Sequence, residues 1–550
     1  MSSIKRSGII SNLTSTIKDQ DEFLTTLKLL NDGCQEIESF QHEYDYQPDH
    51  PGNGFRSLVK TINKYFDRVN QLKKLNGSLL RDYVVIGNTL VKSVILVMLV
   101  REKGVNFDPT DMSDLDMEFF TKLFNTGKED IQPLVGQISF FNLKGGLDIF
   151  LKRVFFFLHF SITSLWSKVK MICSPKYARN LMTHGSVSMN LRTAQSLTPE
   201  GIYMLGVKAM NRLDTRSTRV QRIKVASNNE WLLSVPDQRS PAVLVNKPHR
   251  SVMTSSVLIT PNNVEKGNKK ILLYIHGGGF IAVTAEMTTG IMSRTVKQLK
   301  VPVLIPDYRK IPDHKFPSSL QDVFDVYMFL SSGGSEVIQR IGFVPEEIVI
   351  CGDSAGGHMT LGLTLVLNRL RKMGVGVRMP VSLAIQYPCA VPCFLAVPSY
   401  ALIPLDAVLG VGFVGLVASF FAPLDPPLTD DQWYTKKDGT VERTIKRFDH
   451  RLKDPLFNLL AAPGDVFEDL KDIPLFVLAC EMDPILDHSV MIASKWRGRV
   501  QLDIVPDMPH GFVSYYLYGG VKNELQVYYE QMRQAVQCAP LTSNNNNSNC

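Results

Sequence analysis

Three residues far apart in the sequence have the types that acyl transfer requires: a serine, an acid and a histidine. The serine, Ser354, stands in the run GDSAG at 352–356, directly after the apolar stretch 348–351. Glycines two positions before and two after a serine are typical of a sharp turn from a strand into a helix, where the hydroxyl projects above the sheet. Ser354 is therefore the candidate nucleophile.

A second motif, HGGGF at 276–280, follows another apolar stretch at 271–275. The N–H groups of Gly277 and Gly278, together with that of Ala355, could hold the negative oxygen of a tetrahedral intermediate. Loss of one such donor costs roughly 3 to 4 kcal/mol. A flexible glycine turn is the simpler alternative, and a phosphate loop would continue with Gly-Lys-Ser/Thr rather than Phe280. We predict an oxyanion hole formed by Gly277, Gly278 and Ala355.

The candidate acid and base each follow a further apolar stretch. Asp483 lies just beyond the stretch 475–479, at a point where an acid can reach a neighbouring loop. Glu481 and Asp487 are alternative acids near the same strand end. The candidate base, His510, lies in VPDMPHGF, after a strand-like run and a proline. A single acid or histidine in such a place is more often structural than catalytic, so the combination matters more than any one member.

The order of the three groups along the chain supports the assignment. Ser354 comes first, Asp483 second and His510 third, each after its own strand, which is the order expected of α/β-hydrolases. His510 would accept the Ser354 proton during attack and return a proton to the leaving alcohol, while Asp483 fixes the imidazole tautomer. Water would then release the acyl group from the serine. This chemistry needs no metal and no cofactor.

The elements that must position these groups differ between the two parts of the chain. Apolar residues near the N-terminus recur at intervals of three and four, which predicts an amphipathic helix: Phe55, Leu58, Val59, Ile62, Phe66, Val69 and Leu72. From about Val220, short β-rich runs alternate with helix-length segments, which indicates a mostly parallel sheet with helices on both faces. The predicted strands are 271–275, 301–305, 348–351, 381–386, 475–479 and 500–505.

The chain therefore divides into three predicted parts. We expect a helical N-terminal domain over 1–218, an α/β catalytic domain over 219–540 and a disordered Asn-rich tail over 541–550. Of the 550 residues, 44% are hydrophobic and 21% are charged, so a disordered or collagen-like chain is excluded. The net charge of +7 is spread along the chain without a dense basic block, which does not favour nucleic-acid binding.

Cysteine spacing and the apolar segments indicate in which cellular compartment the protein resides. The eight cysteines form no CxxC pair, and the N-terminus lacks the apolar run of a secretory signal, so a reducing cytoplasm is expected. Three segments, 83–100, 154–166 and 407–421, are strongly apolar, but the first contains Lys92 and the others are too short to span a bilayer. An acyl pocket or a lipid-contacting surface could use them, and ordinary core packing explains them at least as well.

Taken together, the motifs resemble the hormone-sensitive lipase family of esterases. The runs that carry the resemblance are HGGGF at 276–280, PDYRKIPDHKFPSSLQD at 306–322, GDSAGG at 352–357, DPILD at 483–487 and PHGF at 509–512. Upstream, PGNGFRSLV at 51–59 is similar to the helical N-terminal domain of the eukaryotic members. The resemblance implies the α/β-hydrolase fold, with an eight-stranded, mostly parallel sheet, and structural roles for Asp307 and Tyr308.

The resemblance also implies a substrate class, and this sequence departs from the family pattern at a few positions. It implies hydrolysis of neutral lipid esters, such as diacylglycerol, triacylglycerol or sterol esters, in lipid catabolism. The family usually has Glu at the position of Asp313 and often Asn at that of His358, neither of which does chemistry. The acid follows the nucleophile by 483 − 354 = 129 residues, an interval too short for the long regulatory module of the animal lipases. Kinase control of the animal type is therefore not expected.

Two other functions stay open at the level of sequence. One is a soluble carboxylesterase that acts on short acyl groups and ignores lipid interfaces. The other is a non-catalytic small-molecule receptor, since plant hormone receptors of this fold keep the pocket and lose the catalytic histidine; the presence of His510 argues against it. Peripheral contact of the N-terminal domain with a lipid droplet or membrane surface, and the oligomeric state, are left open.

Overall fold

The computed structural model describes most of the predicted sheet and part of the N-terminal helical region. The described residues are 21–45, 52–71, 77–102, 218–234, 242–247, 252–262, 269–281, 283–311, 314–392, 397–406, 409, 417, 421, 452–514 and 521–538. The apolar segment 154–166, most of 407–421, Asp313 and the Asn-rich tail lie outside them. The predicted domain boundary near residue 218 stays a prediction.

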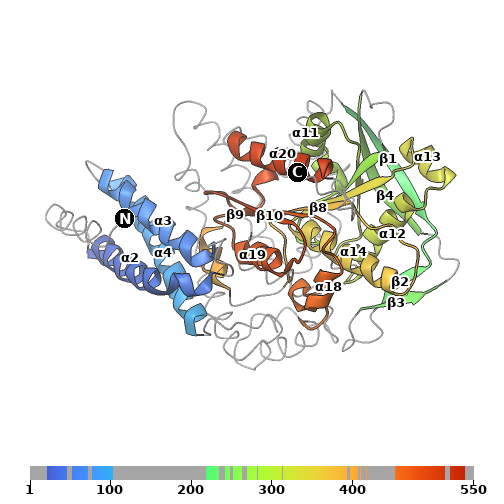
Figure 1. The fold of residues 1–550 in the computed structure, drawn as a ribbon. Coiled ribbons are helices and arrows are strands. Elements are labelled where there is room, and N and C mark those ends of the chain that lie inside the picture. Colours follow the sequence, from blue (N-terminus) through green and yellow to red (C-terminus); the bar gives the residue numbers. More distant parts are fainter. Residues whose placement is uncertain are drawn as a thin grey trace.

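An eight-stranded sheet forms the centre of the molecule, in the order β1-β4-β6-β5-β7-β8-β9-β10 (Figure 1). All six predicted strands are present and parallel to one another: β5 (Lys270–Ile275), β6 (Val303–Pro306), β7 (Glu347–Asp353), β8 (Ser382–Gln386), β9 (Leu475–Cys480) and β10 (Val500–Val505). Two strands that were not predicted, β1 (Thr218–Ser227) and β4 (Val252–Pro261), complete one edge in antiparallel pairing. This is the α/β-hydrolase arrangement, and the predicted fold class is confirmed.

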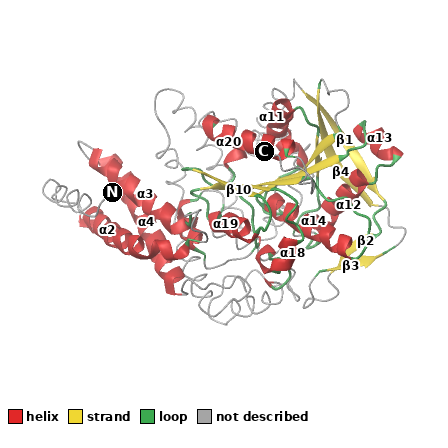
Figure 2. Cartoon of the chain, viewed as in Figure 1, coloured by secondary structure: helices red, strands yellow, loops and turns green. Residues whose placement is uncertain are grey.

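Helices cover both faces of the sheet, which explains why its central strands are apolar throughout (Figure 2). On β5, Ile271, Leu273 and Ile275 pack into the core beneath α12 (Ser318–Ser331) and α14 (Ala355–Lys372). Leu272 and Tyr274 point to the other face, into the core formed with α11 (Thr289–Leu299) and α20 (Lys522–Gln537). The remaining described elements are β2 (Trp231–Ser234), β3 (Val243–Asn246), η5 (Ala285–Thr288), α13 (Ser335–Ile341), η6 (Pro398–Leu405), η7 (Leu459–Ala461), α18 (Gly464–Glu468) and α19 (Leu486–Lys495).

Helices near the N-terminus form a separate group beside the β9–β10 side of the sheet (Figure 1). They are α2 (Asp21–Phe40), η1 (Gln41–Tyr44), α3 (Gly54–Gln71) and α4 (Gly77–Glu102). The predicted apolar face of α3 is buried, with Phe55, Ile62 and Phe66 fully covered. The apolar segment 83–100 lies within α4. Within the described residues, no helix combines the length and apolarity that a membrane crossing requires.

Candidate active site

Ser354 occupies the turn between strand β7 and helix α14. Its backbone has a φ of 54°, a value that non-glycine residues rarely adopt. Both flanking glycines are required by close packing against the end of β5: a Cβ at Gly356 would lie 1.8 Å from the carbonyl oxygen of Ile275, and one at Gly352 would lie 2.7 Å from the same atom. The elbow thus holds the Ser354 hydroxyl at the carboxyl end of the central strands.

The structure brings the predicted nucleophile, base and acid together. His510 Nε2 lies 2.9 Å from Ser354 Oγ, and His510 Nδ1 lies 2.7 Å from Asp483 Oδ2. An ionised carboxylate only accepts hydrogen bonds, so Nδ1 carries the proton and Nε2 accepts from the serine hydroxyl. The second oxygen of Asp483 accepts the N–H of Ile485 at 2.9 Å, which fixes the orientation of the carboxylate. The three side chains are buried, with Ser354 the most exposed at 8%.

Charges around His510 favour its protonated form. Burial disfavours the imidazolium, yet the adjacent carboxylate of Asp483 and the more distant ones of Asp406 and Asp353 outweigh it, so the pKa of His510 lies above its ordinary value of 6.5. Asp406 also accepts the backbone N–H of His510 at 3.2 Å. Asp406 was not predicted, because it lies 104 residues before His510 and no local pattern marks it.

Both alternative acids have other partners. The Glu481 carboxylate lies 2.6 Å from Lys60 Nζ of helix α3. Asp487 is fully buried and accepts the backbone N–H of Ser399. Neither carboxylate contacts the imidazole in the part of the chain that the structure describes. The geometry therefore favours Asp483 over both alternatives as the candidate acid.

The glycine run after β5 corrects one predicted residue. The N–H of Gly277 donates to Asp353 Oδ1 at 2.8 Å, so it is not available to an oxyanion, and its inclusion in the oxyanion hole was wrong. Gly278 and Gly279 both have positive φ, at 104° and 60°, and for neither N–H do the described residues supply an acceptor. The N–H of Ala355 opens helix α14 and has no intrahelical partner. The geometry therefore favours Gly279 over Gly277 as the candidate oxyanion donor beside Gly278 and Ala355.

Comparison with known proteins agrees with this geometry. A family model described as "alpha/beta hydrolase fold" matches residues 272–403, and one described as "Hormone-sensitive lipase (HSL) N-terminus" matches residues 9–78. These two matches support an α/β-hydrolase of the hormone-sensitive lipase type with an N-terminal helical region. Both predicted halves of the resemblance, the catalytic motifs and the N-terminal region, are therefore confirmed.

Individual relatives match parts of this chain. Esterase LipU of Mycobacterium tuberculosis is 34% identical over 25% of this chain and 40% of its own length. Arylacetamide deacetylase of Oryctolagus cuniculus is 25% identical over 50% of this chain and 76% of its own length. Hormone-sensitive lipase of Mus musculus is 28% identical over 33% of this chain and 23% of its own length. The chain therefore spans less than half the length of two of these three relatives.

Among solved structures, a Pyrobaculum calidifontis esterase matches with a TM-score of 0.45 at 17% identity, over 61% of this chain and 91% of that chain.

Asp307 and Tyr308, which directly follow β6, contact His276 at the start of the glycine run. His276 is buried and stacks on Tyr308, with 4.3 Å between ring centroids. The Tyr308 hydroxyl donates to the carbonyl oxygen of His276 at 2.8 Å, and Asp307 Oδ1 lies 3.8 Å from His276 Nε2. Burial lowers the pKa of His276, so its ring is neutral and serves packing. The structural roles expected for Asp307 and Tyr308 fit these contacts.

An aromatic cluster lies beside the glycine run 277–279. Phe280 packs against Phe421 at 4.0 Å between centroids, and Phe316 and Phe457 pack against Phe421 at 5.2 and 5.7 Å. The edge of His358 faces the same rings, and its ring nitrogens contact the carbonyl oxygens of two other loops. The end of the apolar segment 407–421 therefore lies beside the candidate oxyanion loop.

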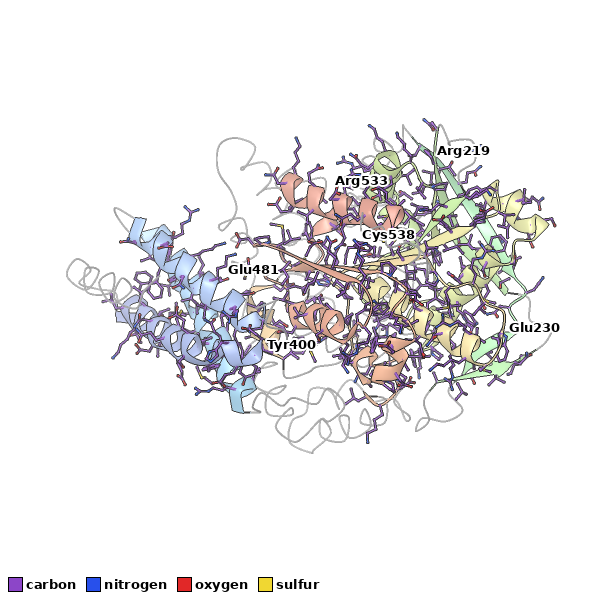
Figure 3. The ribbon with its side chains drawn as sticks, viewed as in Figure 1. Arg219, Glu230, Tyr400, Glu481, Arg533 and Cys538 are labelled. Carbon is purple, nitrogen blue, oxygen red and sulfur yellow. The ribbon has the colours of Figure 1, made fainter. Side chains whose placement is uncertain are left out.

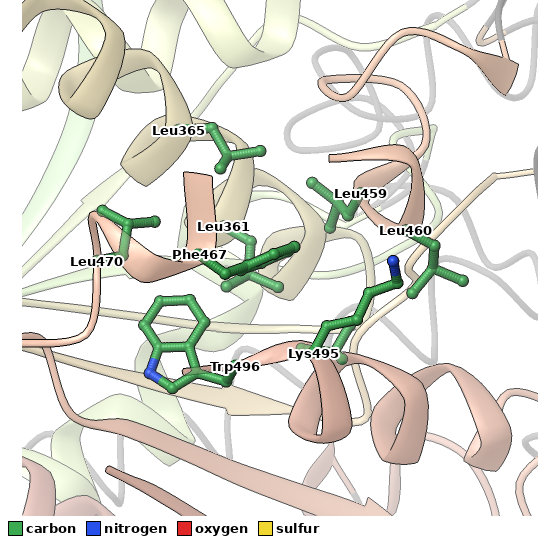
Figure 4. A pocket seen from close by; sticks show the side chains of 9 residues that line it. Leu361, Leu365, Leu459, Leu460, Phe467, Leu470, Lys495 and Trp496 are labelled. Atoms are coloured by element: carbon green, nitrogen blue, oxygen red, sulfur yellow. The ribbon is translucent and has the colours of Figure 1, made fainter. Parts of the chain in front are cut away.

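A small cavity lies behind helix α14, away from these rings. It is bounded by α14, α18, α19 and η7 and lined almost wholly by apolar side chains (Figure 4). Its volume of about 10 Å³ leaves room for a single water molecule at most. We regard it as a packing defect of the core and not as a substrate pocket.

The described residues contain no group of three or more His, Cys, Asp and Glu that could hold a metal ion. Among the described cysteines, Cys351, Cys389 and Cys480 form no disulfide bond. Asp353, which sequence reasoning passed over, stands inside the GDSAGG motif, so the motif itself could have drawn attention to it.

Proposed function

We propose that this chain is a serine hydrolase that cleaves carboxylic esters through an acyl-enzyme on Ser354. The observation that carries the proposal is the unbroken hydrogen-bonded series from the Ser354 hydroxyl through His510 to Asp483, at 2.9 and 2.7 Å. The names of the relatives, which include esterases, a deacetylase and lipases, support the same reaction class.

In the proposed reaction, Ser354 Oγ attacks the ester carbonyl carbon as its proton passes to His510 Nε2. The tetrahedral intermediate collapses when His510 returns that proton to the leaving alcohol. Water then attacks the acyl-enzyme by the same route and releases the carboxylic acid. Asp483 holds the imidazole tautomer and stabilises the imidazolium that forms.

The N–H groups of Gly278, Gly279 and Ala355 serve as donors to the intermediate's negative oxygen in this proposal. They are backbone groups in the loop after β5 and at the start of α14, and these two elements are held together by the close contact between Gly356 and Ile275. Donors fixed before the reaction stabilise the developing charge without reorganising, which is the main advantage of such a site.

For the substrate we propose neutral lipid esters, with diacylglycerol, triacylglycerol and sterol esters as the class. The match to the N-terminus of hormone-sensitive lipase supports this substrate class, and the buried aromatic cluster around Phe421 makes the surroundings of the glycine run apolar. Such substrates would place the enzyme in the cytoplasm at the surface of lipid droplets.

A substrate panel on the purified chain tests the proposal. We expect the wild type to hydrolyse p-nitrophenyl butyrate and emulsified diacylglycerol, and we expect Ser354→Ala to lower kcat about 10⁶-fold, as in other triad enzymes. Turnover of the short ester alone would favour a soluble carboxylesterase. Ligand binding without turnover of any ester would favour the receptor alternative and contradict the proposal.

A further inference from the structure

Helix α3 of the N-terminal region contacts the loops that carry the candidate acid and base. Lys60 Nζ lies 2.6 Å from both carboxylate oxygens of Glu481, two residues before Asp483. Lys64, one helical turn later, forms an ion pair with Asp507, and Lys60 Nζ lies 3.9 Å from the same carboxylate. Figure 3 labels Glu481 on the side of the sheet that faces α3.

The two loops are also joined to each other. The N–H of Asp507 donates to Glu481 Oε2 at 2.8 Å, and the N–H of Met482 donates to the carbonyl oxygen of Met508 at 3.0 Å. This pairing brings two carboxylates together, with side-chain exposures of 17% for Glu481 and 24% for Asp507. Like charges at partly buried positions repel each other strongly unless cations accompany them. The two lysines of α3 supply those cations.

A second, buried contact ties the start of α3 to the same region. A Cβ at Gly54 would lie 2.1 Å from the Cα of Ser399, so only glycine allows α3 to rest on η6. The N–H of Gly54 lies 3.4 Å from Asp487 Oδ2, and the hydroxyl of Ser399 donates to the carbonyl oxygen of Pro484 at 2.8 Å. η6 leads directly into Asp406, the residue that holds the backbone of the candidate base.

These contacts explain why the run PGNGFRSLV stands out in the sequence. The side chain of Asn53 accepts the N–H groups of Phe55 and Arg56, which caps α3, and donates to the carbonyl oxygen of Gln41. Because Gly54 has no side chain, the start of α3 can pack directly against η6. The motif thus builds and docks the helix whose later turns carry the two lysines.

We propose that α3 is a positioning element for the triad: through Lys60 and Lys64 it holds the Glu481 and Asp507 loops at the spacing that keeps Asp483 in contact with His510. The inference rests on the proposed function, since it assigns the N-terminal helices a part in the same reaction. The lysines touch no reacting atom and act only through the two loops.

The test compares kcat and KM of p-nitrophenyl butyrate hydrolysis between wild type and the double variant Lys60→Met/Lys64→Met. Small displacements of catalytic groups lower the rate steeply, so we expect kcat to fall about 10-fold or more with KM within about twofold. Lys60→Arg/Lys64→Arg keeps both charges and should restore kcat. Arg56→Met is the matched control, because Arg56 lies on the same helix and pairs with Asp45 within the N-terminal region.

Hydrogen exchange provides a second measurement that does not depend on turnover. In the Met double variant, amides of the two loops, 481–487 and 505–514, should exchange faster than in wild type, while those of the Arg56→Met protein should not. Unchanged kcat and unchanged loop exchange in the double variant would overturn the inference and leave the proposed function intact. Failure of the proposed function would be seen instead as a wild-type protein without Ser354-dependent turnover.

Discussion

The protonation of His510 determines the pH at which the proposed enzyme works. The neutral imidazole must accept the serine proton, and the surrounding carboxylates hold the pKa of His510 above 6.5 despite burial. kcat/KM for p-nitrophenyl butyrate should therefore rise with pH through a midpoint above 6.5. A profile with its midpoint at or below that value would contradict the electrostatic description of the site.

Removing the charge of the acid should affect both the rate and the pH profile. In Asp483→Asn, the carboxylate that contributes most to raising the pKa of His510 is gone and the wrong tautomer is favoured. We expect kcat to fall about 10⁴-fold and the residual activity to titrate at lower pH than in wild type. Asp465→Asn, at an exposed position on α18, is the control and should change neither quantity.

Asp353 should support the oxyanion loop. Its carboxylate accepts the N–H of Gly277 at 2.8 Å and the hydroxyl of Tyr274 at 2.5 Å, and so joins the end of β5 to the elbow. Asp353→Ala should lower kcat by about 10- to 100-fold with little change in KM, because misplaced donors weaken binding of the transition state more than of the substrate. Tyr274→Phe keeps the contact with Gly277 and should cost less. Equal kcat in wild type and Asp353→Ala would refute this role.

Sequence reasoning identified Ser354, Asp483 and His510 because each follows an apolar strand in a recognisable run. It failed at Gly277, because the N–H of Gly277 donates to the side chain of Asp353, which lies 76 residues later in the sequence on another strand. Asp406 was missed for a related reason: it reaches the backbone of His510 only through the tertiary fold.

At the scale of elements, the contact between β5 and α14 should be intolerant of any added atom. Gly356→Ala would place a methyl group 1.8 Å from the carbonyl oxygen of Ile275, so the backbones must separate, and we expect a loss of about 3 kcal/mol or more of unfolding free energy. Gly362→Ala, in the same helix, meets only Leu320 at 3.4 Å and should be neutral or stabilising by about 0.5 to 1 kcal/mol. Urea unfolding of both variants measures the difference, and equal stabilities would contradict the packing argument.

The parallel strands β5 to β9 were predictable because their central residues are apolar and buried, whereas β10 is only partly buried and alternates apolar with polar residues. The strands β1 and β4 were not predicted, because seven of the ten residues of β1 are exposed or partly exposed and β4 carries Thr254, Ser255 and Ser256. Antiparallel strands with polar residues lack the continuous apolar run that marks β5 to β9.

At the scale of the whole molecule, the docking of the N-terminal helices should make stability depend on pH. Burial raises the pKa of Asp487 to about 7, from 3.8 in the unfolded chain. Its contribution to stability is therefore fully present below pH 3.8 and is lost as pH rises through 7. Asp487→Asn should be more stable than wild type at pH 8, by at most about 4 kcal/mol, and the gain should shrink towards pH 5.

Urea unfolding at pH 5 and pH 8 measures this difference, with Asp465→Asn as the exposed control. A gain from Asp487→Asn that is the same at both pH values would show that Asp487 does not titrate as described. The sequence could not have predicted this behaviour, because Asp487 becomes buried only where Ser399 and Gly54, from distant parts of the chain, close over it.

The identity of the nucleophile is the central claim, and covalent labelling tests it most directly. A fluorophosphonate reacts with an activated serine and leaves a stable adduct that mass spectrometry of proteolytic peptides can place. We predict one adduct per chain, on Ser354, formed much more slowly in His510→Ala and absent from Ser354→Ala. An adduct on another residue, or a wild-type protein that forms none, would contradict the account.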